Sequence, residues 1–172
     1  EFNLVKDSTV NAFCMPGGKV VFFEGILPVT QTEAGVAVVM GHEIAHAVAN
    51  HSKERLSQQI LLSYGASAAD LLFSQKSETT RYGIQTLYGL GAQLGVILPY
   101  SREHEFEADR LGLIFMAIAG YNPNEAVAFW ERMSANDPNA QLDFMSTHPT
   151  NAKRIANMKN VLAEAMGYYQ KN

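Results

Sequence analysis

The sequence predicts an α+β fold that is mainly α-helical and forms a single domain over residues 1–172. Short β-rich runs are confined to the first 28 residues, and long helical patterns follow them. Apolar residues make up 47% of the chain and charged residues 17%, which is typical of a protein with a packed core. The formal net charge is −4 and no basic run occurs, so we expect no nucleic-acid partner. The single cysteine, Cys14, excludes an internal disulfide framework.

The first elements are predicted to be strands. Val10–Met15 and Lys19–Phe23 are β-rich runs on either side of Pro16-Gly17-Gly18, a pattern that predicts a hairpin. Gly25 and Pro28 then end the β region. Two roles stay open for this sheet: it covers the core, or one strand is an open edge that pairs with an extended peptide.

A long apolar helix is predicted next. Thr30-Gln31-Thr32-Glu33 has the pattern of a capping box, so the helix is expected to begin near Gln31 and to continue through Asn50. From Ala34 to Ala49 the chain is almost entirely apolar, which indicates a buried helix. The strongly polar exceptions are His42, Glu43 and His46.

These three polar residues need partners, because burying them unpaired costs a few kcal/mol each. His42 and His46 are four residues apart and share one helix face, where two imidazoles can bind one metal ion with Glu43 beside them as a base. His51 follows His46 by five residues, roughly 140° further around the same helix. It is therefore expected to point away from the metal face, as a surface or second-layer histidine.

The middle of the chain is less distinctive. Residues 56–81 look helical and amphipathic, and Ser74–Arg81 is a candidate mobile loop. The uncharged run Tyr82–Ser101 is long enough to raise a transmembrane helix. It contains Gln, Thr, four glycines and Pro99, which disfavour a membrane span. A crossing would also place the segments before and after it on opposite sides of the membrane, although both are needed to build one metal site. A packed or membrane-touching helix is the better prediction.

The second half is predicted to be helical. Arg102–Ala119 begins with charged residues and becomes apolar, and a turn with Gly120 ends it. A helix over Asn124–Ala135 places Trp130 on its core face, and another runs from about Thr150 to Gly167.

The two histidines need a third protein ligand to complete a catalytic metal site. Glu105 and Asp109 share one helix face, so Glu105 can bind the metal while Asp109 accepts a hydrogen bond from a ligand histidine. Gly112 lies one turn on and permits close helix approach. Glu103 and Glu107 lie roughly opposite and are expected to be solvated or ion-paired. The alternative is that these acidic residues only form a charged first part of the helix and bind no metal.

Several motifs carry a family resemblance. The run from Ser101 to Gly112 looks like the S-R-x-x-E-x-E-A-D-x-x-G signature of HtpX-like and CaaX-prenyl-protease-like zinc metallopeptidases. Asn11-Ala12-Phe13 with the Pro-Gly-Gly turn resembles the N-terminal hairpin of that family. Ser146-Thr147-His148-Pro149 through Arg154-Ile155 resembles its T-H-P…R-I segment. With the H-E-x-x-H run, these motifs occur in the family's order along nearly the whole chain.

The resemblance implies a zincin-like (gluzincin) domain whose small sheet packs on the H-E-x-x-H helix. It implies one Zn²⁺ per chain, held by His42, His46 and Glu105, with Asp109 as the supporting carboxylate. It places His148 and Arg154 near the metal, either to bind the substrate's oxyanion or, as in BepA-like members, with His148 capping the zinc.

The predicted function is a zinc metalloendopeptidase in which Glu43 takes the proton from the attacking water. The resemblance to soluble BepA-like and LoiP-like members implies peptide or misfolded-protein substrates and quality control at the cell envelope, periplasmic or membrane-associated. Peripheral membrane contact is possible, and the oligomeric state is open. The alternative is a chaperone-like module with a self-inhibited zinc site. Two other interpretations are disfavoured. A di-iron bundle needs a second E-x-x-H motif, which the sequence lacks. A structural zinc site needs a fourth ligand, unless His148 supplies it.

Overall fold

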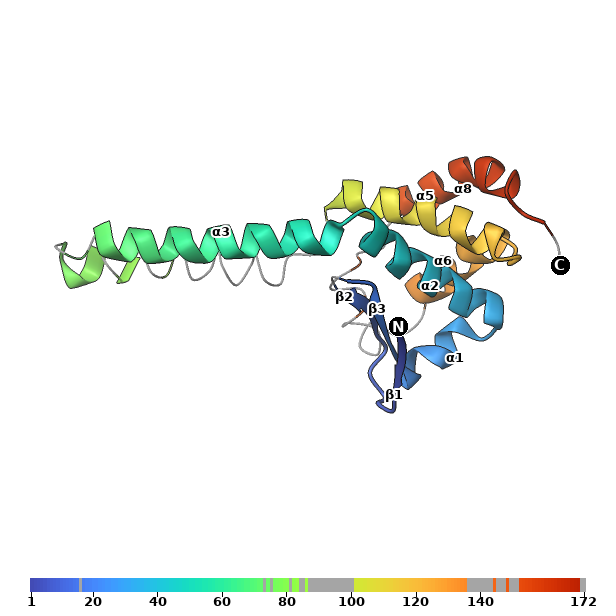
Figure 1. Cartoon of the computed structure of the whole chain (residues 1–172), viewed down its shortest axis with the longest axis horizontal. Coiled ribbons are helices and arrows are strands. Elements are labelled where there is room, and N and C mark those ends of the chain that lie inside the picture. Colours follow the sequence, from blue (N-terminus) through green and yellow to red (C-terminus); the bar gives the residue numbers. More distant parts are fainter. Residues whose placement is uncertain are drawn as a thin grey trace. The chain divides into compact units, whose positions relative to one another are not determined.

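The computed structural model describes residues 1–15, 17–72, 74, 76–80, 82, 83, 86, 101–135, 144, 148 and 152–170. Figure 1 shows helices together with a small N-terminal sheet, which confirms the mainly helical α+β fold. The chain divides into two compact units, one formed by Glu1–Ser52 with Pro99–Asn172 and the other by Lys53–Leu98. The single domain over residues 1–172 stays a prediction.

The sheet has three strands, β1 (Phe2–Val5), β2 (Ala12–Met15) and β3 (Lys19–Phe23), in the order β1-β3-β2. β2 and β3 pair antiparallel, as the predicted hairpin requires. β1 pairs with β3 in parallel and was not predicted. Parallel neighbours need a long connection, so no local turn signal marks their pairing in the sequence.

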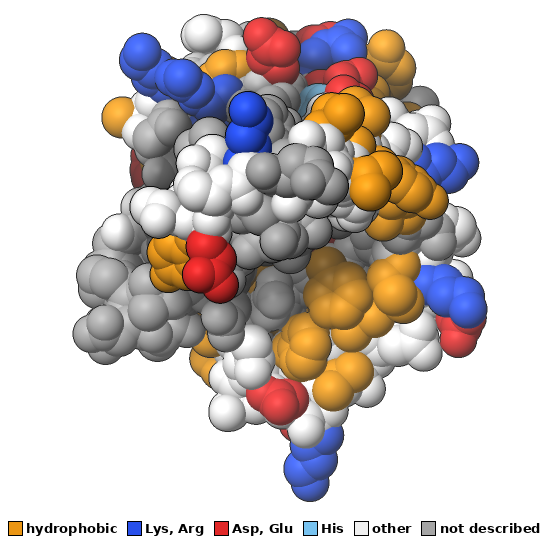
Figure 2. Space-filling view, turned by 90° about the vertical axis from the view of Figure 1, so that its left-hand side faces the viewer, with side chains coloured by type: hydrophobic (Ala, Val, Ile, Leu, Met, Phe, Trp, Pro, Cys, Tyr) orange, Lys and Arg blue, Asp and Glu red, His pale blue; other side chains and the backbone are white. Residues whose placement is uncertain are grey.

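One face of the sheet is only partly covered. Phe2 and Leu4 of β1 pair in register with Val20 and Phe22 of β3, so the four side chains share a face. Val20 and Phe22 are buried, whereas Phe2 and Leu4 remain 64% and 61% exposed. On the face drawn in Figure 2, hydrophobic side chains also reach the surface in patches, and Lys and Arg side chains are spread among them.

Two short helices, η1 (Glu24–Ile26) and α1 (Leu27–Thr30), lead into the long helix α2 (Glu33–Val48). The predicted start of α2 near Gln31 is two residues early. Thr32 caps the helix, because its hydroxyl accepts a hydrogen bond from the Gly35 N–H at 3.0 Å. Thr30 closes α1 instead, where its hydroxyl donates to the Leu27 carbonyl.

The predicted continuation of α2 through Asn50 is wrong. α2 ends at Val48, Asn50 has a left-handed backbone with φ 61°, and α3 (His51–Leu72) begins directly afterwards. Asparagine tolerates this conformation better than most residues. Because the helix breaks before His51, the angle of 140° measured on one continuous helix does not apply to that residue.

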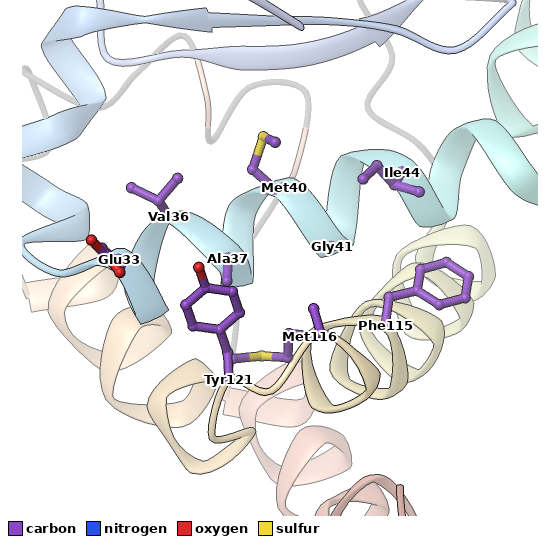
Figure 3. A pocket seen from close by; sticks show the side chains of 10 residues that line it. Glu33, Val36, Ala37, Met40, Gly41, Ile44, Phe115, Met116 and Tyr121 are labelled. Atoms are coloured by element: carbon purple, nitrogen blue, oxygen red, sulfur yellow. The ribbon is translucent and has the colours of Figure 1, made fainter. Parts of the chain in front are cut away.

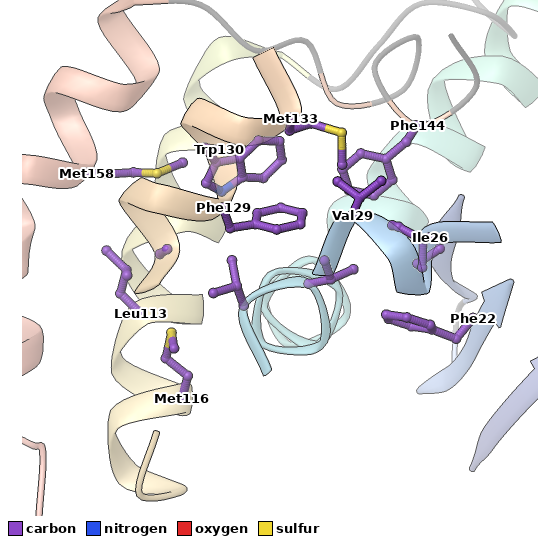
Figure 4. Packing of buried hydrophobic residues seen from close by; sticks show 14 of the residues in the cluster. Phe22, Ile26, Val29, Leu113, Met116, Phe129, Trp130, Met133, Phe144 and Met158 are labelled. Carbon is purple, nitrogen blue, oxygen red and sulfur yellow. The ribbon is translucent and has the colours of Figure 1, made fainter. Parts of the chain in front are cut away.

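The core forms where α2 meets α5 (Arg102–Ile118) and α6 (Asn124–Ala135), and α8 (Ala152–Met166) packs on α5 and α6. Figure 4 shows side chains from these helices, from α1 and from the sheet meeting around α2. Trp130 is 1% exposed, which confirms its predicted core position. β2 also packs on α2, as the resemblance implied. The sheet and the later helices therefore hold α2 between them.

α2 and α5 come unusually close where two glycines face each other. A Cβ atom added to Gly112 would lie 2.9 Å from the backbone nitrogen of His42, and one added to Gly41 would lie 2.7 Å from the Gly112 carbonyl oxygen. Real Cβ atoms do not approach backbone so closely. The predicted role of Gly112 in close helix approach is therefore confirmed, and the contact falls beside a predicted metal ligand.

Two sequence predictions concern the segment after α3. Most of the predicted mobile loop Ser74–Arg81 lies within the described residues, where 78–80 are helical, and its mobility stays a prediction. The uncharged run Tyr82–Ser101 lies largely outside the described residues. Among the helices of the described residues, none combines the length and apolar character that crossing a bilayer demands.

We predict that Gly112→Ala lowers the free energy of unfolding by about 1–3 kcal/mol, because the new methyl group must push α5 away from α2. Urea unfolding measures this change. Gly41→Ala acts at the same contact, so the double variant should be less destabilised than the sum of the two. Gly83→Ala is the control, since its Cβ meets no described atom within 4 Å. Full stability in Gly112→Ala would contradict the close contact.

Candidate metal centre

Four buried side chains from three parts of the chain converge between α2 and α5. They are two residues of α2, one of α5 and one from the segment before α8, namely His42, His46, Glu105 and His148. One potential ligand atom from each lies within 4.8 Å of all the others. The His42 Nε2 atom is 3.1 Å from both His46 Nε2 and His148 Nδ1. Glu105 Oε1 is 3.1 Å from His148 Nδ1 and 3.3 Å from His46 Nε2.

These distances fit a tetrahedral cage. Ligands about 2.0–2.1 Å from a central zinc ion lie roughly 3.3 Å from one another, close to the separations in the cluster. The donor set, imidazole nitrogens with one carboxylate, also suits that metal. The residues present therefore fit a bound metal ion, and the cluster is able to hold one.

Asp109 orients one of the histidines. Its Oδ1 atom is 3.1 Å from Nδ1 of His42, so the ring can donate its Nδ1 proton to the carboxylate and keep the Nε2 lone pair for the cluster. This is the position that the sequence predicted for Asp109. Both groups are almost completely buried, which keeps water from competing for the hydrogen bond.

Arg154 contacts two buried carboxylates of α5, Asp109 and Glu105. Its Nε and Nη2 atoms donate to the two oxygens of Asp109 at 2.6 and 2.8 Å, and Nη1 lies 2.7 Å from Glu105 Oε2. The guanidinium also stacks over Trp130, with Cζ 4.0 Å from the ring centroid. Arg154 is thus brought to the site as predicted. In this geometry the guanidinium faces two carboxylates, which makes it a positioning group.

Burial and charge act differently on the ionisable groups. Burial alone would raise the pKa of Glu105, but the Arg154 guanidinium and His148 outweigh it and hold that pKa below its usual value. Burial lowers the pKa of His46 well below its usual value. Both shifts favour the ligand forms that a metal ion needs, a carboxylate and a neutral imidazole.

Glu43 lies beside the cluster. Its Oε1 atom is 3.3 Å from Nε2 of His148. Burial raises the pKa of Glu43, the direction that suits a group taking up a proton from water. The Cys14 carbonyl of β2 accepts a hydrogen bond from the Ser52 hydroxyl at 3.2 Å. Because this carbonyl is engaged within the chain, this point of β2 favours the covering role for the sheet.

His51 lies behind the cluster. It is 2% exposed, and its Nδ1 atom is 3.0 Å from Nδ1 of His46. The expectation that it points away from the metal face is wrong, because α2 ends before it and Asn50 changes the direction of the chain. Of the two interpretations, surface or second layer, the second is correct. Glu107 Oε2 lies 3.3 Å from Nε2 of His51, and its side chain is 57% exposed. Glu103 is exposed as well, so both carboxylates are solvated as predicted. The sequence signal for this turn was Asn50 itself, because asparagine is one of the residues that end a helix in the left-handed conformation.

A separate pocket lies on the face of α2 opposite His42 and His46. It is an apolar pocket of about 340 Å³ between α2 and the end of α5, lined among others by Met40, Phe115 and Tyr121 (Figure 3). Its lining residues on α2 repeat every three or four positions, on the face turned away from His42 and His46. Apart from Glu33 at its rim, the lining has no acidic or basic side chain, so the metal centre is the better candidate for chemistry.

The fold and the buried H-E-x-x-H cluster define a metallopeptidase-type centre. The pattern of Peptidase family M48 matches residues 1–162, and the chain belongs to that family. The resemblance stated from the sequence motifs is therefore confirmed.

Curated relatives agree with this assignment. The chain is 40% identical over 167 residues to "Mitochondrial metalloendopeptidase OMA1" of Schizosaccharomyces pombe, covering 96% of this chain and 47% of the relative. It is 34% identical over 180 residues to the protein of that name from Saccharomyces cerevisiae, covering 100% and 50%. It is 26% identical over 164 residues to the "Beta-barrel assembly-enhancing protease" of Escherichia coli, covering 92% and 34%. The chain thus spans half or less of the length of these relatives.

We predict that Arg154→Ala lowers the free energy of unfolding by about 3–5 kcal/mol, because it leaves two buried carboxylates without their cation. Chemical denaturation measures the loss. Arg110→Ala is the matched control, since Arg110 pairs with Glu164 on the surface and water replaces the partner there. Equal stability of the two variants would show that Arg154 does not balance the site's charge.

Proposed function

We propose that the chain is the catalytic part of a zinc-dependent metalloendopeptidase, with one Zn²⁺ held by His42, His46 and Glu105. The observation that carries this proposal is the convergence of these ligand atoms with the Glu43 carboxylate beside them. Membership of a peptidase family and metalloendopeptidase relatives support the reaction class.

Each residue has a distinct task in this proposal. A zinc ion in the cage would supply Lewis acidity, lowering the pKa of a water and polarising a peptide carbonyl. Glu43 takes the proton from the attacking water and delivers it to the leaving amine. Asp109 fixes the tautomer of His42, and Arg154 keeps Asp109 and Glu105 in place while neutralising their charge.

His148 is proposed to cap the site in the form that the structure represents. Its Nδ1 atom stands at the fourth corner of the cage, and its Nε2 atom faces Glu43, so the ring takes the space that a water would need. Its ring stacks on Phe144, and its backbone N–H donates to the Phe144 carbonyl. Among the two roles left open by the sequence, this geometry favours capping over oxyanion binding.

The substrates are proposed to be peptides or misfolded proteins at the cell envelope, in a periplasmic or membrane-associated setting with possible peripheral membrane contact. The name "Beta-barrel assembly-enhancing protease" of one group of relatives supports this setting, whereas the other group is named as mitochondrial. A chaperone-like module with a self-inhibited zinc site is the second candidate, because the fourth corner of the cage is filled by His148.

We predict that Glu43→Gln reduces cleavage of a casein or peptide substrate by at least about 100-fold while one zinc per chain is retained, because only the proton carrier is lost. Glu33→Gln, the same change on the exposed first turn of α2, is the control. Unimpaired proteolysis in Glu43→Gln would remove Glu43 from the mechanism. Wild-type protein that binds unfolded substrate without cleaving it, with or without a chelator, would favour the chaperone-like function.

We predict that His148→Ala raises peptidase activity and keeps the zinc, because three ligands remain and the fourth corner opens to water. Peptide cleavage and metal analysis on the same samples measure both effects. A fall in activity with zinc retained would instead support oxyanion binding. Unchanged activity would take His148 out of the site.

A further inference from the structure

We infer that His51 is a positioning residue that fixes the ring of the metal ligand His46, as the middle link of a chain that begins at Glu107. The inference rests on the proposed function, because it concerns the ligand set of the same site. It adds a residue that lies outside the H-E-x-x-H motif and outside the proposed ligands.

The side chains of His46, His51 and Glu107 are connected one after another by two polar contacts. Nε2 of His46 faces the cluster, and its other nitrogen, Nδ1, is 3.0 Å from Nδ1 of His51. On the far side of the His51 ring, Nε2 is 3.3 Å from Oε2 of Glu107. A hydrogen-bonded path therefore runs from a carboxylate near the surface, through one imidazole, to the ligand imidazole.

Only one arrangement of protons satisfies every contact in this path. A metal ion needs the Nε2 lone pair of His46, so the ring proton of His46 must be on Nδ1. That proton is donated to Nδ1 of His51, which must then be the unprotonated nitrogen of its ring. The proton of His51 is left on Nε2, where the Glu107 carboxylate accepts it. Glu107 thus selects the tautomer of His51, and His51 selects that of His46.

The other ligand histidine shows the same principle in a shorter form. Nδ1 of His42 meets the Asp109 carboxylate directly at 3.1 Å. His46 lies on the next turn of α2, and its Nδ1 is linked to the Glu107 carboxylate of α5 through the interposed His51 ring. Each ligand ring is therefore held by one carboxylate of α5, and outer partners of this kind raise metal affinity.

The surroundings hold the His51 ring in the required plane. It is buried, and the His104 ring stacks on it with centroids 4.2 Å apart and an angle of 19° between the planes. Glu107, by contrast, has a side chain that is 57% exposed. The His46–His51 hydrogen bond is therefore shielded from water, whereas the outer link is open to solvent. Loss of the inner contact should do more harm than loss of the outer one.

Two substitutions of His51 separate a hydrogen-bonding role from simple packing. Asparagine places its amide near the position of Nδ1 and can still accept the proton of His46. Glutamine places its amide near Nε2, where it reaches toward Glu107 but not toward His46. The two side chains are similar in polarity, so a packing role alone predicts similar behaviour. Glu107→Ala tests the outer link, and Glu103→Ala, one turn earlier on α5 and exposed, is its control.

The probe is cobalt(II) added to the metal-stripped full chain, with affinity measured by competition with a coloured chelator and ligand geometry by visible absorption. We expect His51→Gln to bind cobalt about 10–100-fold more weakly than the wild type and with a changed absorption band. His51→Asn should recover most of the affinity and the wild-type band. Glu107→Ala should show a smaller loss than His51→Gln, and Glu103→Ala none.

Equal cobalt affinities and identical bands for His51→Asn and His51→Gln would overturn the inference, whether both resemble the wild type or both are weakened. Circular dichroism of the metal-free variants checks that each is folded. A wild type that binds cobalt but cleaves no peptide would contradict the proposed function and leave the positioning role standing. A wild type that binds no cobalt would overturn both.

Discussion

The structure depends on one constraint: ionisable side chains lie in a dry interface between two helices, where each must be matched by a partner. Glu105 and Asp109 are 2% and 4% exposed, and they face the ligand histidines of α2. Unpaired charges at such depth would cost several kcal/mol each. Arg154 supplies the compensating cation, and a metal ion in the cage would add to it. The polar cluster and the apolar core around it are thus mutually dependent.

This constraint explains the surrounding architecture. Gly41 and Gly112 let the backbones of α2 and α5 meet, so ligands from both helices reach one point. Trp130 of α6 covers the cluster from the core side by packing against both His42 and Arg154. β2 packs against α2, the helix that carries Glu43. Each layer of the fold therefore contributes a contact that orients a group in the site.

The sequence predicted the centre better than its surroundings. The i, i+4 spacings of His42 with His46 and of Glu105 with Asp109 depend only on helix geometry, which is local and regular. The parallel pairing of β1 was missed because it joins residues distant along the chain. His51 was oriented wrongly because one left-handed residue, Asn50, ended the helix on which its angle was measured. The roles of His148 and Arg154 rested on resemblance, since their approach to α2 depends on the tertiary fold.

The central claim is that side chains from α2, α5 and the segment before α8 bind one metal ion together. X-ray absorption at the zinc edge of the zinc-loaded protein tests it most directly. The account predicts one zinc per chain, with four nitrogen or oxygen ligands at about 2.0–2.1 Å, of which three are imidazoles. A sulfur ligand, a six-oxygen shell or fewer than three imidazoles would contradict it.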